Sequence, residues 1–195
     1  MTWLNEIILA TALVLPHDMP NNDTLSAARA AVNTAEEAFG PTHPATAMIL
    51  RNLALAYQQA GLYCRAETTA QRSLAILEAV FGPADVSLTP VLNVLTETYA
   101  AQGRYIEARR FAMRAVAIGP DAEAHYATAL HNLGAVFENE GKINEAKEYY
   151  RRALSAREAL LPVGHPHIEL TRAALARVSA NPNTVSLWRS GFRRR

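Results

Sequence analysis

The chain has 195 residues, half of them hydrophobic, which is enough to bury a substantial core. Its 19 basic and 18 acidic residues nearly cancel to a formal net charge of +1, so no overall field favours nucleic acid or a membrane surface, and we expect neither as a partner. A single cysteine, Cys64, excludes an internal disulfide and leaves no second thiol for a metal site. Few aromatic residues and abundant alanine favour an all-helical protein, because small side chains let helices cross closely.

The N-terminal part is predicted to form a degenerate helix hairpin over residues 3–39. Within it, the apolar run from Ile7 to Leu15 is too short to span a bilayer, and it lacks the basic start and cleavage site of a signal peptide. We expect no membrane span and a cytoplasmic protein, while a secreted or periplasmic location stays open if residues 1–16 are the remnant of a signal. The second helix of this hairpin is predicted from Asp23, its N-cap, to Phe39.

One phrase then recurs three times along the chain. It consists of Leu, a small residue, an aromatic residue four positions after the Leu, a glycine four positions later, and an alanine five positions after that glycine. The copies start at Leu53, Leu95 and Leu133. Their glycines stand at positions 61, 103 and 141, so the phrase repeats at intervals of 42 and then 38, which is typical of stacked supersecondary units.

Each copy predicts a hairpin of two helices. Apolar residues before the glycine recur at helical spacing, as in Leu50, Leu53 and Tyr57. The glycine ends the first helix because it adopts the left-handed conformation without steric cost, and a second apolar face follows. We predict one array over residues 1–180, with repeats at about 44–82, 86–119 and 122–161, a closing helix over 166–180, and a basic tail over 181–195.

The connections between hairpins repeat as well. Phe39-Gly40-Pro41 returns as Phe81-Gly82-Pro83, and His43-Pro44 returns as His165-Pro166. This match indicates that His165 is a recurring residue of the linker between hairpins. Zinc is not expected at His165 and His167, because a site needs third and fourth ligands that are missing. We expect no metal and no other cofactor.

These fixed positions resemble the tetratricopeptide repeat, and the 42-residue spacing with its Phe-Gly-Pro and His-Pro linkers is similar to the kinesin-light-chain-like variety. The resemblance implies an all-α fold, a right-handed superhelical solenoid of antiparallel hairpins. In it Ala54 or Gly134 allows close packing of the second helix, whereas Thr96 is expected to be slightly overpacked. It further implies a non-enzymatic scaffold or adaptor that binds a peptide segment of a partner protein in a concave groove. Motifs for a catalytic serine or a phosphate-binding loop are also missing.

Carried over position by position, the resemblance places groove-facing side chains on the first helix of each repeat. They are Met48, Arg51, Asn52, Leu55, Gln59, Asn93, Glu97, Thr128, His131, Asn132 and Asn139. In the family, asparagines at the positions of Asn52 and Asn132 bond the backbone of an extended ligand, but Val94 interrupts that series. A mixture of Arg51, Glu97 and His131 suits a ligand that is mostly uncharged or has a single acidic anchor near Arg51.

Two alternatives stay open at this point. A self-associating structural module that stacks through its end helices, giving a homo-oligomer, competes with the adaptor. In the tail, Trp188 and Phe192 either cover the edge of the last helix or, with the neighbouring arginines, contact phosphates or anionic lipid.

Overall fold

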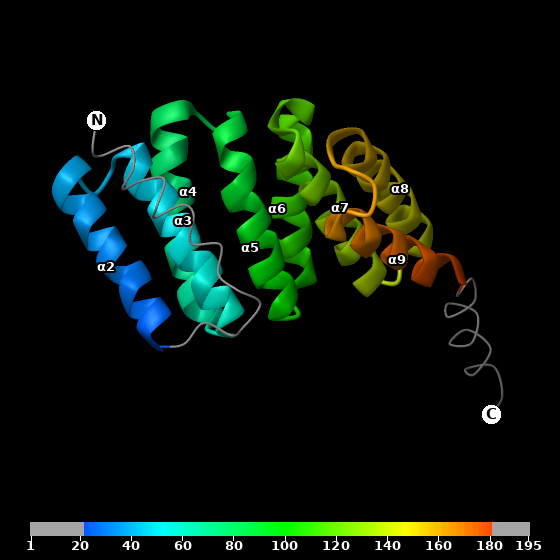
Figure 1. Cartoon of the computed structure of the whole chain (residues 1–195), viewed down its shortest axis with the longest axis horizontal. Helices are drawn as coiled ribbons and strands as arrows, with labels where there is room; N and C mark the ends of the chain where they lie inside the picture. Colours follow the sequence, from blue (N-terminus) through cyan, green and yellow to red (C-terminus); the bar gives the residue numbers. More distant parts are fainter. Residues whose placement is uncertain (1–21, 181–195) are drawn as a thin grey trace. The chain divides into compact units, whose positions relative to one another are not determined.

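A computed structural model describes residues 22–180 of the chain, and their regular secondary structure is helical (Figure 1). The chain divides into two compact units, the first ending at Arg104 and the second beginning at Tyr105. The boundary falls in the turn of the repeat predicted at 86–119, so the two helices of that repeat belong to different units. Residues 3–21 of the predicted degenerate hairpin and the tail over 181–195 lie outside the described residues. Between residues 22 and 180, no helix is long and apolar enough to cross a membrane.

The first unit is a row of packed helices, each against its neighbour in sequence. Its elements are α2 (Asn22–Phe39), α3 (Pro44–Gln59), α4 (Tyr63–Phe81), the 3-10 helix η1 (Val86–Leu88) and α5 (Thr89–Ala101). Helix α3 packs against α2 and α4, and α5 packs against α3 and α4, as the blue to green helices of Figure 1 show. The predicted second helix of the degenerate hairpin is therefore present as α2.

The second unit continues the same pattern. Its elements are α6 (Tyr105–Ile118), η2 (Pro120–Ala122), α7 (Ala124–Asn139), α8 (Ile143–Leu160) and α9 (Pro166–Ala180). Helix α7 packs against α6 and α8, and α9 packs against α8. Helix α9 spans the range given above for the closing helix. A core cluster in this unit joins α8 to α9 through Ala146, Tyr150, Ala174 and Val178.

The turn inside each repeat has one geometry in all three copies. The turn glycines have φ values of 72°, 75° and 74° at Gly61, Gly103 and Gly141. In each copy, the N–H that follows the glycine donates to the carbonyl of the aromatic residue four positions before it, which is the Schellman pattern. The three bonds run from Leu62 to Tyr57 (2.8 Å), Arg104 to Tyr99 (2.9 Å) and Lys142 to Phe137 (2.8 Å). The prediction that these glycines end the first helices is confirmed.

Histidine caps two of the first helices in the same way. The His43 Nδ1 atom accepts the backbone N–H of Ala45 at 3.1 Å before α3, and the His165 Nδ1 atom accepts that of His167 at 3.2 Å before α9. Asp85, one repeat interval after His43, caps η1 with its carboxylate. A side-chain acceptor at this position satisfies an N–H that the helix leaves without a partner. His165 is therefore a recurring linker residue, as predicted, and it caps the helix that follows.

The two units differ where the helices of a repeat cross. In the first unit, Ala54 of α3 and Ala70 of α4 occupy the crossing and are fully buried. In the second, the equivalent residues are Gly134 and Tyr150, and a Cβ atom added to Gly134 would lie 2.8 Å from the Tyr150 Cδ1 atom. The space that this glycine leaves is therefore taken by an aromatic ring. Thr96 is buried and its hydroxyl donates to the Leu92 carbonyl at 2.8 Å, while its overpacking stays a prediction.

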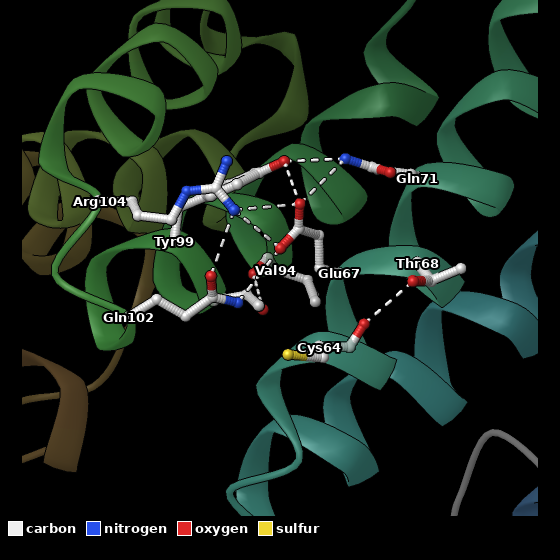
Figure 2. A network of polar contacts seen from close by, with 9 residues as sticks. Cys64, Glu67, Thr68, Gln71, Val94, Tyr99, Gln102 and Arg104 are labelled. Atoms are coloured by element: carbon white, nitrogen blue, oxygen red, sulfur yellow. Dashed lines mark hydrogen bonds and ion pairs between the residues drawn. The ribbon is translucent and has the colours of Figure 1, made fainter.

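A polar network joins α4 to the end of α5 in the first unit (Figure 2). The Glu67 carboxylate accepts hydrogen bonds from the Tyr99 hydroxyl at 2.9 Å, the Gln102 amide at 3.3 Å and the Arg104 guanidinium at 3.0 Å. Gln71 donates to the same Tyr99 hydroxyl at 2.8 Å. Tyr99 is the aromatic residue of its repeat, so the network fixes both the ring and the turn that follows it.

Candidate functional site

The predicted groove residues lie on three helices in two units. Helices α3 and α5 carry Met48 to Glu97 in the first unit, and α7 carries Thr128 to Asn139 in the second. Each unit therefore presents its own part of the candidate site.

The five predicted residues of α3 share one face of that helix. They follow the spacing expected for one side of an α-helix and lie opposite the face that is buried against α2 and α4. Two large apolar side chains of this face are exposed, Met48 to 45% and Leu55 to 39%. Arg51 and Asn52 lie half-buried between them, and Gln59 is exposed at the end of the helix.

Arg51 is the charged centre of this face. Its guanidinium donates to the Asn52 Oδ1 atom, from Nη2 at 2.8 Å and from Nε at 3.3 Å. Burial lowers the pKa of Arg51, yet a guanidinium stays protonated in proteins. In the part of the chain that the structure describes, no carboxylate forms an ion pair with it. The face thus carries a partly desolvated positive charge that is not neutralised by an ion pair within residues 22–180.

On α5 the predicted residues are less accessible. Asn93 is buried, with 5% of its surface exposed, and Glu97 is half-buried. The Glu97 Oε2 atom accepts a hydrogen bond from Gln58 Nε2 of α3 at 3.2 Å, which ties the two first helices of this unit together. Gln58 was not predicted, although it lies seven residues after Arg51 and therefore on the same side of α3. Only its proximity to Glu97, on a different helix, reveals its role.

On α7, His131 makes its contacts inside the second unit. Its Nδ1 atom lies 3.2 Å from the Thr171 Oγ1 atom of α9, and its ring centroid lies 5.2 Å from that of Tyr150. Burial, and then the positive charge of Arg157, lower the pKa of His131 to about 4, so it is neutral at pH 7. Its observed contacts position α8 and α9. A ligand role for His131 stays a prediction.

The other predicted residues of α7 differ in accessibility. Asn132 is buried, with 9% of its surface exposed, whereas Asn139 is exposed. The Thr128 hydroxyl and the Asn139 amide donate to carbonyls of their own helix at 3.0 and 2.8 Å. Their roles in ligand binding also stay predictions.

The sequence profile of the tetratricopeptide repeat matches residues 21–79, 49–121 and 91–159, which together cover more than half of the chain. The chain belongs to the tetratricopeptide repeat family. No curated protein sequence matches it. Membership in this family supports a general role as a protein-interaction scaffold.

Solved structures confirm the fold of this tetratricopeptide repeat protein. The chain superimposes on BtubC (BKLC) from P. vanneervenii with a TM-score of 0.69 and 21% identity, covering 81% of this chain and 65% of BtubC. A putative kinesin light chain from Podosopora anserina, with nearly identical TPR-like repeats, gives a TM-score of 0.66 and 20% identity over 92% of this chain and 86% of that one. The apo form of RapI gives 0.67 and 18%, over 80% and 56%. The predicted all-α solenoid of the kinesin-light-chain-like kind is confirmed.

Proposed function

We propose that this protein is a non-enzymatic adaptor that holds a peptide segment of a partner protein on the α3 face formed by Met48, Arg51, Asn52, Leu55 and Gln59. One observation carries the proposal. Two exposed apolar side chains flank a half-buried guanidinium that makes no ion pair with any carboxylate of residues 22–180. Single exposed apolar residues are ordinary, but their combination with a desolvated charge on one face favours a ligand that supplies both apolar contacts and an acid.

The geometry suggests how each side chain would contribute. Met48 and Leu55 are two helical turns apart, about 10 Å along the helix, so they would contact two separate apolar side chains of the peptide. Arg51 would pair with a single carboxylate, because its planar fork matches the two carboxylate oxygens. Asn52 accepts from Arg51 through its Oδ1 atom, which leaves its amide N–H groups available to donate to a peptide carbonyl.

A random-peptide display library selected on the full chain would test the proposal. Selected peptides would be titrated against the wild type, Met48→Glu and Arg51→Ala, and we expect each substitution to weaken binding about tenfold, or about 1.4 kcal/mol. The matched control is Met113→Glu on α6, a methionine of similar exposure (52%) outside the proposed face.

Equal loss in the Met113→Glu control, or unchanged binding by Met48→Glu, would assign the peptides to another surface. Light scattering on the same samples addresses the self-associating alternative. A mass that rises with protein concentration favours that alternative, and a constant monomer mass removes it.

A further inference from the structure

Helix α9 is attached to the second unit by few large apolar side chains. Its buried residues are Ile168, Thr171, Ala174 and Val178, so a hydroxyl and a methyl group occupy the middle of the side that packs against α8. An element held by little apolar contact opens at a lower free energy than the rest of a protein. The polar contacts of α9 therefore have a large share in keeping it in place.

A polar cluster joins α9 to α7 and α8. The Arg157 side chain of α8 is buried, and its guanidinium donates to the Thr171 hydroxyl oxygen and, at 2.8 Å, to the His167 carbonyl, both of α9. The Thr171 hydroxyl donates its own proton to the His167 carbonyl at 3.0 Å, so its oxygen is an acceptor for other groups. The His131 Nδ1 atom of α7 lies 3.2 Å from that oxygen, and the His131 ring lies against Tyr150 of α8. These hydrogen bonds exist only while α9 is in place.

The first unit has apolar side chains at the equivalent positions. Alignment of the turn glycines of the first and third repeats makes Leu77 of α4 the equivalent of Arg157, and Val91 of α5 the equivalent of Thr171. Leu77 and Val91 are both buried. The repeat therefore requires neither a guanidinium nor a hydroxyl at this junction. Burying a charge costs desolvation energy that an apolar pair does not, so the polar version of the junction points to a role other than stability.

The charges that face His131 would change if α9 left. Burial disfavours a proton on this ring, whereas the Glu138 carboxylate of α7 favours one. The groups that repel a proton are Arg157 of α8 and Arg177 and His167 of α9. With α9 in place, the Glu138 carboxylate accepts hydrogen bonds from Arg177 at 2.7 and 2.8 Å. Departure of α9 removes Arg177 and His167, takes the acceptors named above away from Arg157, and leaves the Glu138 carboxylate to attract a protonated His131.

We propose that α9 is an acid-released latch, in which proton uptake by His131 detaches α9 from α7 and α8. Neutral His131 fits the cluster, because its Nδ1 atom can share a hydrogen bond with the Thr171 hydroxyl while Arg157 holds the start of α9. Protonated His131 does not fit, because the cluster already contains a buried guanidinium. Release uncovers the apolar side of α8 at Ala146 and Tyr150, which α9 covers with Ala174 and Val178. The latch uses no residue of the α3 peptide face and does not depend on the adaptor proposal.

The size of the effect follows from proton linkage. Burial, and then Arg157, lower the pKa of His131 to about 4 with α9 in place, and the released state regains the ordinary value of 6.5. Because the pKa is lower in the closed state, the stabilisation of that state is complete above pH 6.5 and is lost as the pH falls towards 4. Between pH 7 and pH 5, the equilibrium constant for release of α9 is expected to rise roughly twentyfold.

Hydrogen exchange of the backbone amides in the ¹⁵N-labelled full chain tests the latch. Exchange rates at pH 7 and pH 5 are divided into those of an unstructured peptide at the same pH, which gives a protection factor for each amide. We expect the protection factors of α9 to fall roughly twentyfold and those of α3 to stay unchanged. Unchanged protection in α9 would overturn the proposal. An equal fall in α3 and α9 would overturn it as well, because the whole chain would then be destabilised.

A pair of matched variants tests whether His131 is the trigger. His131→Asn introduces the residue that the middle repeat has at the equivalent position, Asn93, and should give α9 the same protection at pH 7 and pH 5. The control is His43→Asn in the first unit, where asparagine can cap α3 in place of the imidazole, and it should retain the twentyfold fall in α9. A twentyfold fall in folded His131→Asn would overturn the proposal.

If His131→Asn does not fold, an NMR titration of the His131 ring in the wild type decides. The latch requires a midpoint clearly below the ordinary 6.5, at the pH where α9 loses its protection. Any other midpoint overturns the proposal.

Discussion

The two units share one repeat pattern but fill its interior with different side chains. The first unit places Ala54 against Ala70, whereas the second places Gly134 against Tyr150. The second unit thus removes a methyl group from one helix and adds a large ring on the other. The repeat fixes the backbone positions of the two helices. Because protein interiors are close-packed, a smaller side chain on one helix at the crossing is matched by a larger one on the other.

Each unit also has a polar contact between a second helix and the turn of the next repeat, and the charges in this contact differ between the units. In the first unit, Glu67 accepts hydrogen bonds from residues at the end of α5. In the second unit the equivalent residue is Arg109, which pairs with Glu140 at 2.8 Å, and Glu140 also pairs with Lys142 at 2.7 Å. The contact persists although the second-helix residue changes from acidic to basic, because Glu140 stands in place of Gln102 and supplies the carboxylate.

The largest expected effect is at the crossing of the second unit. Tyr150→Ala removes a buried ring that donates to Glu138 at 2.8 Å, and we expect a loss of about 3–5 kcal/mol in unfolding free energy. Urea denaturation followed by circular dichroism measures it.

A double-mutant cycle sharpens the comparison between the two crossings. Gly134→Ala alone should cost about 1–3 kcal/mol, because the new methyl group meets the Tyr150 ring. In the Tyr150→Ala background the same change recreates the alanine pair of the first unit and should gain about 0.5–1 kcal/mol through helix propensity. Equal effects in both backgrounds would show that the ring does not occupy the space left by the glycine.

The next effect is a pH dependence confined to the second unit. The pKa of His131 is about 4 in the folded state and 6.5 ordinarily, so the unfolded state takes up its proton first as the pH falls. The contribution is complete above pH 6.5 and is lost towards pH 4, with a maximum of about 3 kcal/mol. Thermal unfolding of the wild type and His131→Asn between about pH 7 and pH 4.5 measures it. The slope should be smaller in the variant than in the wild type.

A smaller effect is expected at the contact of Glu67 with Gln102 and Arg104. Glu67→Arg places a second guanidinium beside that of Arg104 and loses the hydrogen bonds that Glu67 accepts in Figure 2, for a cost of about 1–2 kcal/mol. Adding Gln102→Glu imitates the arrangement of Arg109 and Glu140 and should restore most of the stability. Chemical denaturation of the single and double variants decides this, and no recovery in the double variant would contradict the equivalence.

The smallest effect is expected at the stacked rings of Phe137 and Tyr149 in the second unit. Tyr149→Thr removes the stack on Phe137 and should cost about 1 kcal/mol. Urea denaturation of the wild type and the variant measures this loss. An unchanged free energy of unfolding would show that the stacked rings do not stabilise the second unit.

The candidate site was predictable only in part. The register of the repeat predicted one shared face for the residues of α3, and Met48 and Leu55 on that face are exposed. It did not show that Asn132 is buried or that His131 contacts α9, because those facts depend on neighbours that are distant in the sequence. Gln58 was missed for the same reason.

The sequence by itself determined the helices, their turns and their caps. The hydrogen bonds of a glycine turn at Gly61, or of a histidine cap at His43, join residues only a few positions apart, so the local sequence contains all their partners. Tertiary structure alone decided which volumes and charges meet. The Tyr150 ring contacts Gly134, and Glu67 binds Arg104, through side chains from separate parts of the chain. No local pattern specifies this packing.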